Sequence, residues 1–186
     1  MKVHIKNMVC QRCKLAVETL LRQCGYHPQQ IELGEVTIAE DLAPGQLQEL
    51  NDNLKNLGFE LIDDRKSQLV EKIKNIIVKL VHHTTDTLTV NLSEYLAQQL
   101  NYEYNYLSNL FSEAEGTTIE KYYISQKMEK VKELLIYDEL TLSQIAYRMG
   151  YSSVAYLSSQ FKKETGLTPS HFKQIKYNKR RNIEEL

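Results

Sequence analysis

Residues 141–172, TLSQIAYRMGYSSVAYLSSQFKKETGLTPSHF, decide the fold of the C-terminal half of the chain. Leu142 and Ile145 begin an apolar pattern with the three- and four-residue spacing of one helix face. Gly150 is expected to end this helix, because a residue without a Cβ readily adopts the left-handed conformation of a helix terminus. Ser152 and Ser153 follow as candidate N-caps for a second helix. The stretch therefore predicts two short helices joined by a tight turn.

The second of these helices has two predicted faces. Its buried stripe is expected at Tyr156, Leu157 and Phe161. Its outer face is polar and carries Ser158, Ser159, Lys162 and Lys163. A short helix, a turn with glycine and a second helix with a polar outer face form the helix-turn-helix layout, whose second helix can enter a DNA major groove.

The same unit occurs twice in the chain. An offset of fifty residues pairs Tyr106 with Tyr156, Leu107 with Leu157, Ser108 with Ser158, Phe111 with Phe161, Gly116 with Gly166, Thr118 with Thr168 and Tyr122 with Phe172. Upstream the offset becomes forty-nine, so that the turn of the second copy is one residue longer. Self-similarity over this length indicates two copies of one supersecondary unit. We place these helix-turn-helix units at residues 91–112 and 141–163, with a long linker helix between them.

The string IAYRMGYSSVAYLSSQFKKETGLTPSHFK, residues 145–173, resembles the C-terminal signature of the AraC/XylS family of bacterial transcription regulators. The resemblance extends over about residues 66–176. It implies two helix-turn-helix units joined by one helix, each reading one of two adjacent major grooves of double-stranded DNA. It also implies RNA polymerase as a partner, and leaves open whether the protein is a monomer or a homodimer.

The base-facing positions of that family, carried over one at a time, fall on Asn105, Ser108 and Asn109 in the first copy and on Val154, Ala155, Ser158 and Ser159 in the second. Many relatives have arginine where Asn109 and Ser159 stand, and without it the bidentate contact to guanine is lost. Asparagine instead pairs with adenine, and Val154 and Ala155 can pack on thymine methyl groups. We therefore expect a site rich in A·T pairs, in two segments about one helical turn apart.

The formal net charge is −1, but its distribution is uneven. Residues 141–181 contain eight basic residues and one acidic residue, a net charge of +7. Residues 86–140 contain four lysines and ten acidic residues, a net charge of −6. We expect the second copy, including Lys162 and Lys163, to supply more of the salt-dependent affinity for DNA phosphates.

The first sixty-odd residues have a different pattern. Residues 2–6 alternate like a strand, and residues 15–24 have helical periodicity. Alternating residues on either side of Gly34-Glu35 suggest a tight hairpin. A second helix begins at Pro44-Gly45, and residues 59–62 form a last strand. The order βαββαβ predicts a ferredoxin-like fold over residues 1–64, followed by an all-α DNA-binding domain over residues 66–178.

Cys10 and Cys13 lie where the first strand is expected to turn into the first helix. Two thiols three positions apart at a helix N-terminus can face one small ion, and the helix end lowers their pKa toward thiolate. Soft thiolates select ions such as Cu(I) or Zn(II). A two-ligand site suits near-linear Cu(I), or needs outside ligands to complete a Zn(II) tetrahedron. A reversible disulfide, or a fold that has lost its ligand, remain open alternatives.

The thiol motif and the order of elements together resemble the heavy-metal-associated domain of copper chaperones and metal-transporting ATPases. That resemblance makes Cys10 and Cys13 the metal ligands and Met8 a buried residue that shapes the loop. The chain departs from the pattern at Asn7, where glycine is usual, and at Arg12 between the thiols. Asparagine tolerates the left-handed conformation, whereas Arg12 favours thiolates but repels a cation.

The bulk properties are compatible with one large or two small domains in 186 residues. No apolar run of eighteen residues and no signal-peptide pattern is present, so a cytoplasmic protein without a membrane span is expected. We interpret the chain as a transcription factor and not an enzyme, with metal or thiol state at Cys10 and Cys13 altering DNA affinity. The alternatives are a metal-trafficking module fused to a DNA-binding domain and a thiol-redox protein.

Overall fold

The computed structural model describes the backbone of residues 1–84 and 90–178 and the side chains of residues 1–84 and 90–175. The basic residues Lys179, Arg180 and Arg181 lie outside the described residues. The chain forms two compact units, one of Met1–Lys79 with Tyr102–Gly116 and one of Leu80–Asn101 with the residues from Thr117 onward. No helix in the described ranges combines the length and apolarity needed to cross a bilayer.

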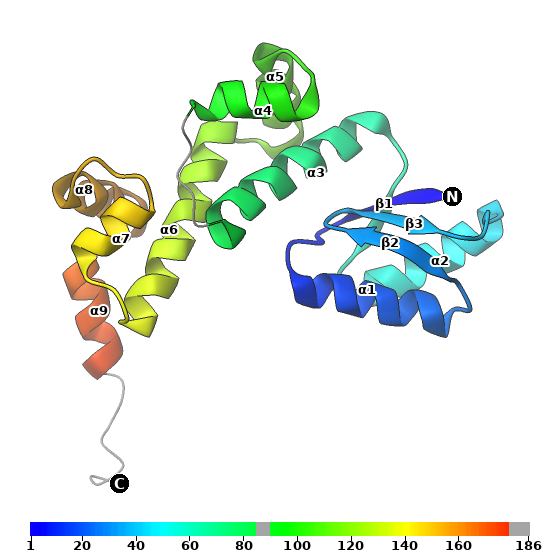
Figure 1. The fold of residues 1–186 in the computed structure, drawn as a ribbon, viewed down its shortest axis with the longest axis horizontal. Coiled ribbons are helices and arrows are strands. Elements are labelled where there is room, and N and C mark those ends of the chain that lie inside the picture. The colour runs from blue at the N-terminus through cyan, green and yellow to red at the C-terminus, as the bar shows by residue number, and fades with distance from the viewer. Residues whose placement is uncertain (85–89, 179–186) are drawn as a thin grey trace, which may run out of the picture. The chain divides into compact units, whose positions relative to one another are not determined.

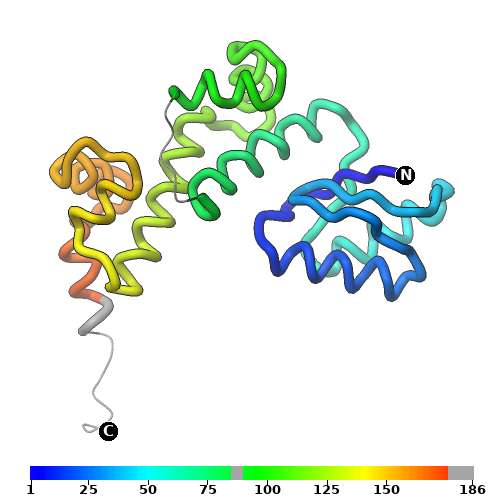
Figure 2. The backbone as a smooth tube through the Cα atoms, in the orientation of Figure 1, coloured from blue at the N-terminus to red at the C-terminus, as the bar shows by residue number. Residues whose placement is uncertain are grey.

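The first unit begins with a small sheet and two helices (Figure 1). The elements are β1 (Lys2–Lys6), α1 (Gln11–Gln23), β2 (Pro28–Glu32), β3 (Glu35–Ile38), α2 (Pro44–Asn56) and β4 (Glu60–Ile62). All neighbouring strands pair antiparallel, in the order β2-β3-β1-β4. This βαββαβ order and four-stranded sheet are compatible with the predicted ferredoxin-like fold. Figure 2 follows the chain through this part in blue and cyan.

Helices α1 and α2 cover one face of the sheet (Figure 1). The core between them consists of alternating strand residues, such as Val3 and Ile5, and one stripe of each helix, including Leu21 and Leu54. Strand periodicity of two and helix periodicity of 3.6 place these side chains on the facing surfaces. This core holds the loop before α1, because Met8 is fully buried in it.

The hairpin turn lies one residue earlier than the sequence pattern suggested. Glu32 pairs with Glu35 across the strands, so that Leu33 and Gly34 form the turn. Gly34 has a φ of +80°, a conformation that glycine adopts without steric cost, and Glu35 is already part of β3. The turn is important below because its backbone contacts the next helix.

Helix α3 (Arg65–Val78) follows β4, and Asp64 caps it by accepting a hydrogen bond from the Ser67 backbone N–H at 2.9 Å. Its apolar stripe is buried at Leu69, Val70, Ile73, Ile77 and Val78, as expected for a core helix. Within the same unit α3 packs against α5 (Tyr104–Glu115). Two polar residues of α3, Glu71 and Asn75, are buried as well, which the sequence pattern did not predict.

The second unit is helical. The π-helical turn η1 (Lys79–His83) leads from α3 into this unit. The unit then contains α4 (Leu92–Leu100), α6 (Ile119–Tyr137), α7 (Leu142–Arg148), α8 (Val154–Thr165) and α9 (Pro169–Asn178). α6 packs against α7, α8 and α9, and α8 packs against both α7 and α9. The core of this packing includes Val131, Ile145, Leu157 and Phe161, with Phe161 edge-on to Phe172 at 5.5 Å between ring centroids.

Candidate DNA-binding and thiol sites

Capping hydrogen bonds and a glycine turn define where α7 and α8 begin and where α7 ends. Thr141 and Gln144 form a capping box, with Gln144 Oε1 accepting from the Thr141 backbone N–H at 2.8 Å. Gly150, at a φ of +68°, makes the turn after α7. Ser153 Oγ then accepts from the Tyr156 backbone N–H at 3.1 Å and starts α8. These caps position α8 as the second helix of a helix-turn-helix.

The first copy is built with different residues. Asn101 follows α4 with a φ of +56°, so an asparagine takes the left-handed position that Gly150 takes in the second copy. α5 then begins at Tyr104 and ends at Gly116, which is left-handed like Gly166 after α8. The two copies thus share their turn and termination geometry through an exchange of Asn for Gly.

All the predicted base-facing residues lie on exposed or partly exposed positions. Asn105, Asn109, Ala155 and Ser159 are exposed, and Ser108, Val154 and Ser158 are partly exposed. Lys162 and Lys163 are exposed in the last turns of α8. The residues Leu107, Phe111, Leu157 and Phe161, which share these helices, are buried, so each recognition helix presents its polar side outward.

Tyr156 was predicted in the buried stripe of α8, and this was wrong because the side chain is 57% exposed. Leu157 and Phe161 are four residues apart and share a face, whereas Tyr156 is rotated about 100° from Leu157. Tyr106, its equivalent on α5, is also exposed and stacks on Tyr102 with 5.6 Å between ring centroids. Sequence reasoning therefore missed an exposed tyrosine at the same position of both recognition helices.

A half-buried lysine contacts aromatic rings of the linker helix α6 and of the corner before α8. Lys127 Nζ lies over the Tyr151 ring at 4.1 Å from its centroid and over the Tyr123 ring at 5.3 Å. Burial lowers the pKa of Lys127 to about 8 and raises the pKa of Tyr151. The aromatic faces favour the ammonium form while desolvation favours the neutral amine.

The thiols occupy the N-terminus of α1. Cys10 is the N-cap residue, Cys13 lies in the first turn, and the two Sγ atoms are 3.2 Å apart. The hydrogen bond from Cys13 lowers the pKa of the Cys10 thiol, with a smaller contribution from the Arg12 charge. Asn7 is left-handed, at a φ of 70°, and donates to the Gly58 carbonyl at 3.0 Å.

The spacing of the two sulfurs can be compared with the geometry of bound ions. With metal–sulfur bonds of about 2.3 Å, two sulfurs lie about 3.8 Å apart on a Zn(II) tetrahedron and about 4.6 Å apart on a linear ion. At 3.2 Å the thiols are closer than either, so binding requires a small rotation of the side chains. Within the described residues no group of three His, Cys, Asp or Glu side chains is suited to a metal ion. The donor set of two thiols fits a two-coordinate ion such as Cu(I), whereas Zn(II) needs further ligands beyond these two thiols.

Comparison with known proteins identifies the helical part. A family model described as a helix-turn-helix domain matches residues 96–175. The C-terminal domain of AraT, a response regulator from Geobacillus stearothermophilus, is 30% identical, with a TM-score of 0.52 over 60% of this chain and 88% of that chain. This chain carries an AraC-type helix-turn-helix domain.

Two curated relatives match the AraC-type domain. An uncharacterized HTH-type transcriptional regulator, YtdP of Bacillus subtilis, is 27% identical over 115 residues, 62% of this chain. The xylose operon regulatory protein of Escherichia coli K12 is 35% identical over 69 residues, 37% of this chain. The matched region spans only 15% and 18% of the length of these relatives. The similarity therefore describes the AraC-type domain and not the remainder of either protein.

Proposed function

We propose that this protein is a DNA-binding transcriptional regulator of AraC type. The observation that carries the proposal is the repeated recognition helix, in which equivalent polar positions of α5 and α8 are exposed while the positions between them form the core. AraC-type helix-turn-helix domains bind double-stranded DNA. In this proposal the protein is cytoplasmic, has no membrane span, is not an enzyme, and contacts RNA polymerase as a monomer or a homodimer.

The base-facing residues proposed are those predicted from the sequence. Asn105 and Asn109 supply amides suited to adenine, and Val154 and Ala155 supply apolar contacts suited to thymine methyl groups. Lys162 and Lys163 supply phosphate contacts. The site they favour is rich in A·T pairs and has two segments about one helical turn apart.

Binding-site selection from random duplexes tests this proposal. We expect an A·T-rich consensus whose affinity, measured by fluorescence anisotropy, falls about five- to 150-fold in an Asn109→Ala variant, as for loss of about 1–3 kcal/mol. Gln48→Ala, an exposed change on α2, is the matched control and leaves affinity unchanged. Guanine-rich half-sites would contradict the residue assignment, and failure to select any sequence would contradict the function.

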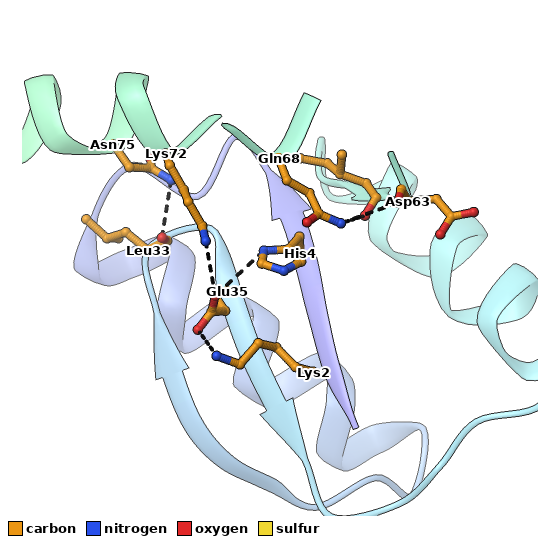
Figure 3. A network of polar contacts seen from close by, with 9 residues as sticks. Lys2, His4, Leu33, Glu35, Asp63, Gln68, Lys72 and Asn75 are labelled. Carbon is orange, nitrogen blue, oxygen red and sulfur yellow. Dashed lines mark hydrogen bonds and ion pairs between the residues drawn. The ribbon is translucent and has the colours of Figure 1, made fainter. Parts of the chain in front are cut away.

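The thiol pair is proposed as the sensor of this regulator. Its support is the 3.2 Å spacing, the lowered pKa of Cys10 and a series of contacts that leads from the thiol loop to α3. Lys14, next to Cys13, pairs with Glu32 at 2.9 Å. The carbonyl of the neighbouring Leu33 accepts a hydrogen bond from Asn75 of α3 at 3.2 Å (Figure 3). A change at the thiols thus has a physical route to the first helix after the sheet.

Anaerobic Cu(I) titration against a competing chelator tests the sensor. We expect tight binding in the reduced protein, loss of binding in Cys10→Ser/Cys13→Ser, and no change in Cys24→Ser as the matched control. A coupling of about 1–3 kcal/mol then corresponds to a five- to 150-fold change in DNA affinity on metal binding. Equal, weak binding in all three proteins would contradict the metal sensor.

The short sulfur–sulfur distance also favours a thiol-redox sensor. An external oxidant such as diamide would accept the two electrons and two protons released when the Cys10–Cys13 disulfide forms. Mass spectrometry after alkylation would detect the bond, and anisotropy would show whether it changes DNA affinity. Copper binding that leaves DNA affinity unchanged would instead indicate a metal-trafficking module fused to the AraC-type domain.

A further inference from the structure

Tyr106 and Tyr156 occupy the same position, the third residue, of the recognition helices α5 and α8. Both side chains are exposed, by 45% and 57%. Neither is among the predicted base-facing residues, and neither lies in the buried core of its helix. One exposed aromatic residue needs no explanation, but the same residue in both copies of a repeated unit indicates a shared role.

A second tyrosine packs against each of these exposed rings. Tyr102 stacks on Tyr106 with 5.6 Å between ring centroids. Tyr151 meets Tyr156 edge-on at the same centroid separation of 5.6 Å. Tyr102 and Tyr151 are themselves equivalent, because they differ by the forty-nine residues that relate the two copies upstream of the recognition helices. Each exposed ring is thus supported on one side, so that ordering it against a ligand costs less entropy.

On α8, Tyr156 lies where the helix is expected to meet the DNA backbone. Residues seven apart lie on one face of a helix, so Tyr156 shares its face with Lys163, which is proposed to contact phosphates. Ser159, a predicted base-facing residue, is about 60° away around the helix, and the buried Leu157 is about 100° away on the other side. Tyr156 therefore borders the base-facing side, where a helix in the major groove lies beside the phosphates.

Helix α5 has fewer means of contacting the DNA backbone. It contains no lysine or arginine, and the residue seven positions after Tyr106 is Glu113. Its contacts to DNA phosphates must therefore come from neutral donors. Tyrosine hydroxyls are among the side-chain groups that bind DNA phosphates. Tyr106 places such a hydroxyl on the face of α5 that corresponds to the Lys163 face of α8.

We propose that the hydroxyls of Tyr106 and Tyr156 each donate a hydrogen bond to a DNA phosphate beside the bases that their helix reads. This inference rests on the DNA-binding function proposed above and adds one positioning residue to each recognition helix. Because the phenol is neutral, its contact releases no counterion and contributes affinity that does not depend on salt. Because it contacts the backbone, it contributes equally to selected and unselected sequences.

Tyr106→Phe and Tyr156→Phe test the proposal, since each variant loses the hydroxyl and keeps the supported ring. Fluorescence anisotropy measures the affinity of the full chain for the selected duplex and for a scrambled duplex of equal length. We expect each variant to lose affinity about three- to tenfold on both duplexes, as for one hydrogen bond, with an unchanged salt slope. Tyr137→Phe, at a 66% exposed site at the end of α6, is the matched control and keeps wild-type affinity.

Duplexes that carry one uncharged methylphosphonate at a time locate the phosphate. We expect one position beside each segment of the site at which the replacement weakens binding by the wild type. At that position the matching Phe variant should lose about threefold less than the wild type, because it has no hydroxyl to donate. Absence of such a position in both segments would overturn the proposal.

The outcomes separate this inference from the proposed function. Unchanged affinity in both Phe variants would overturn the inference and leave DNA binding intact. A loss of affinity in Tyr106→Ala and Tyr156→Ala, but not in the Phe variants, would overturn it as well, since the role would belong to the ring. A wild type that binds neither duplex would contradict the proposed function and this inference together.

Discussion

The two recognition helices have the same length and the same kind of C-terminus, but their exposed side chains carry different charges. α5 and α8 are each twelve residues long and each ends at a left-handed glycine. The last turns of α8 carry Lys162 and Lys163, whereas the equivalent positions on α5 are Ser112 and Glu113. Buried positions are constrained by packing in both copies, but exposed charges are free to differ. The same helix-turn-helix backbone can therefore contribute differently to DNA affinity in its two copies, because the exposed charges differ.

The largest expected effect is at the core phenylalanine that occupies the same position in each copy. Phe161→Ala removes a fully buried ring that contacts Phe172, and should lower the free energy of unfolding of its unit by about 3–5 kcal/mol. Phe111→Ala should cost a similar amount, since its ring is equally buried. Urea unfolding of both variants measures this, with Tyr147→Ala, at an 82% exposed site, as the control. A cost below about 1 kcal/mol in either copy would break the equivalence of the two cores.

The difference in charge should appear in the salt dependence of DNA affinity. The slope of log affinity against log salt is negative, and Lys162→Ala/Lys163→Ala is expected to make it shallower by about 2, because each phosphate contact contributes about 0.9 to its magnitude. Glu113→Lys on α5 should make the slope steeper by about 1, because it adds one lysine that can contact a phosphate. Anisotropy titrations at several salt concentrations measure both. An unchanged slope in the double variant would place the phosphate contacts of the second copy elsewhere.

The helix-turn-helix elements could be predicted because local chemistry fixes them. Thr141, Ser153 and Gly150 each have one structural role, and the apolar spacing selects the buried face. The burial of Glu71 and Asn75 could not be predicted, since a polar pair beside an apolar stripe is normally solvated. The burial of Asn75 depends on its hydrogen bond to the β2–β3 turn, more than thirty residues away in the chain. Likewise the spacing Cys-x-x-Cys predicted the thiol pair, but not the 3.2 Å between its sulfurs.

The second copy should also respond to pH through Lys127. Its folded pKa of about 8 lies below the value of about 10.4 in an unfolded chain, so between these values the unfolded state binds more protons and stability rises with pH. From pH 7 to 9.5 the gain should be about 1–2 kcal/mol. This range lies below the pH at which Tyr123 and Tyr151 titrate, because burial raises the pKa of both. Thermal unfolding across this range measures the gain. Lys127→Met should remove the part of the rise that Lys127 contributes and leave only the part that the lowered pKa of Cys10 contributes. A rise of undiminished size in this variant would contradict the assignment to Lys127.

The smallest expected effect lies at the turn where the copies differ by Asn and Gly. Asn101 and Gly150 are both left-handed, at φ values of +56° and +68°. Asn101→Gly should change stability by less than about 0.5 kcal/mol, because glycine relieves the strain but raises the entropy of the unfolded chain. Asn101→Ala and Gly150→Ala should each cost about 1–2 kcal/mol, since a Cβ disfavours this conformation. Urea midpoints would show whether the two turns are equivalent: a much larger cost at Gly150 would mean that packing against α8, and not backbone conformation alone, requires glycine there.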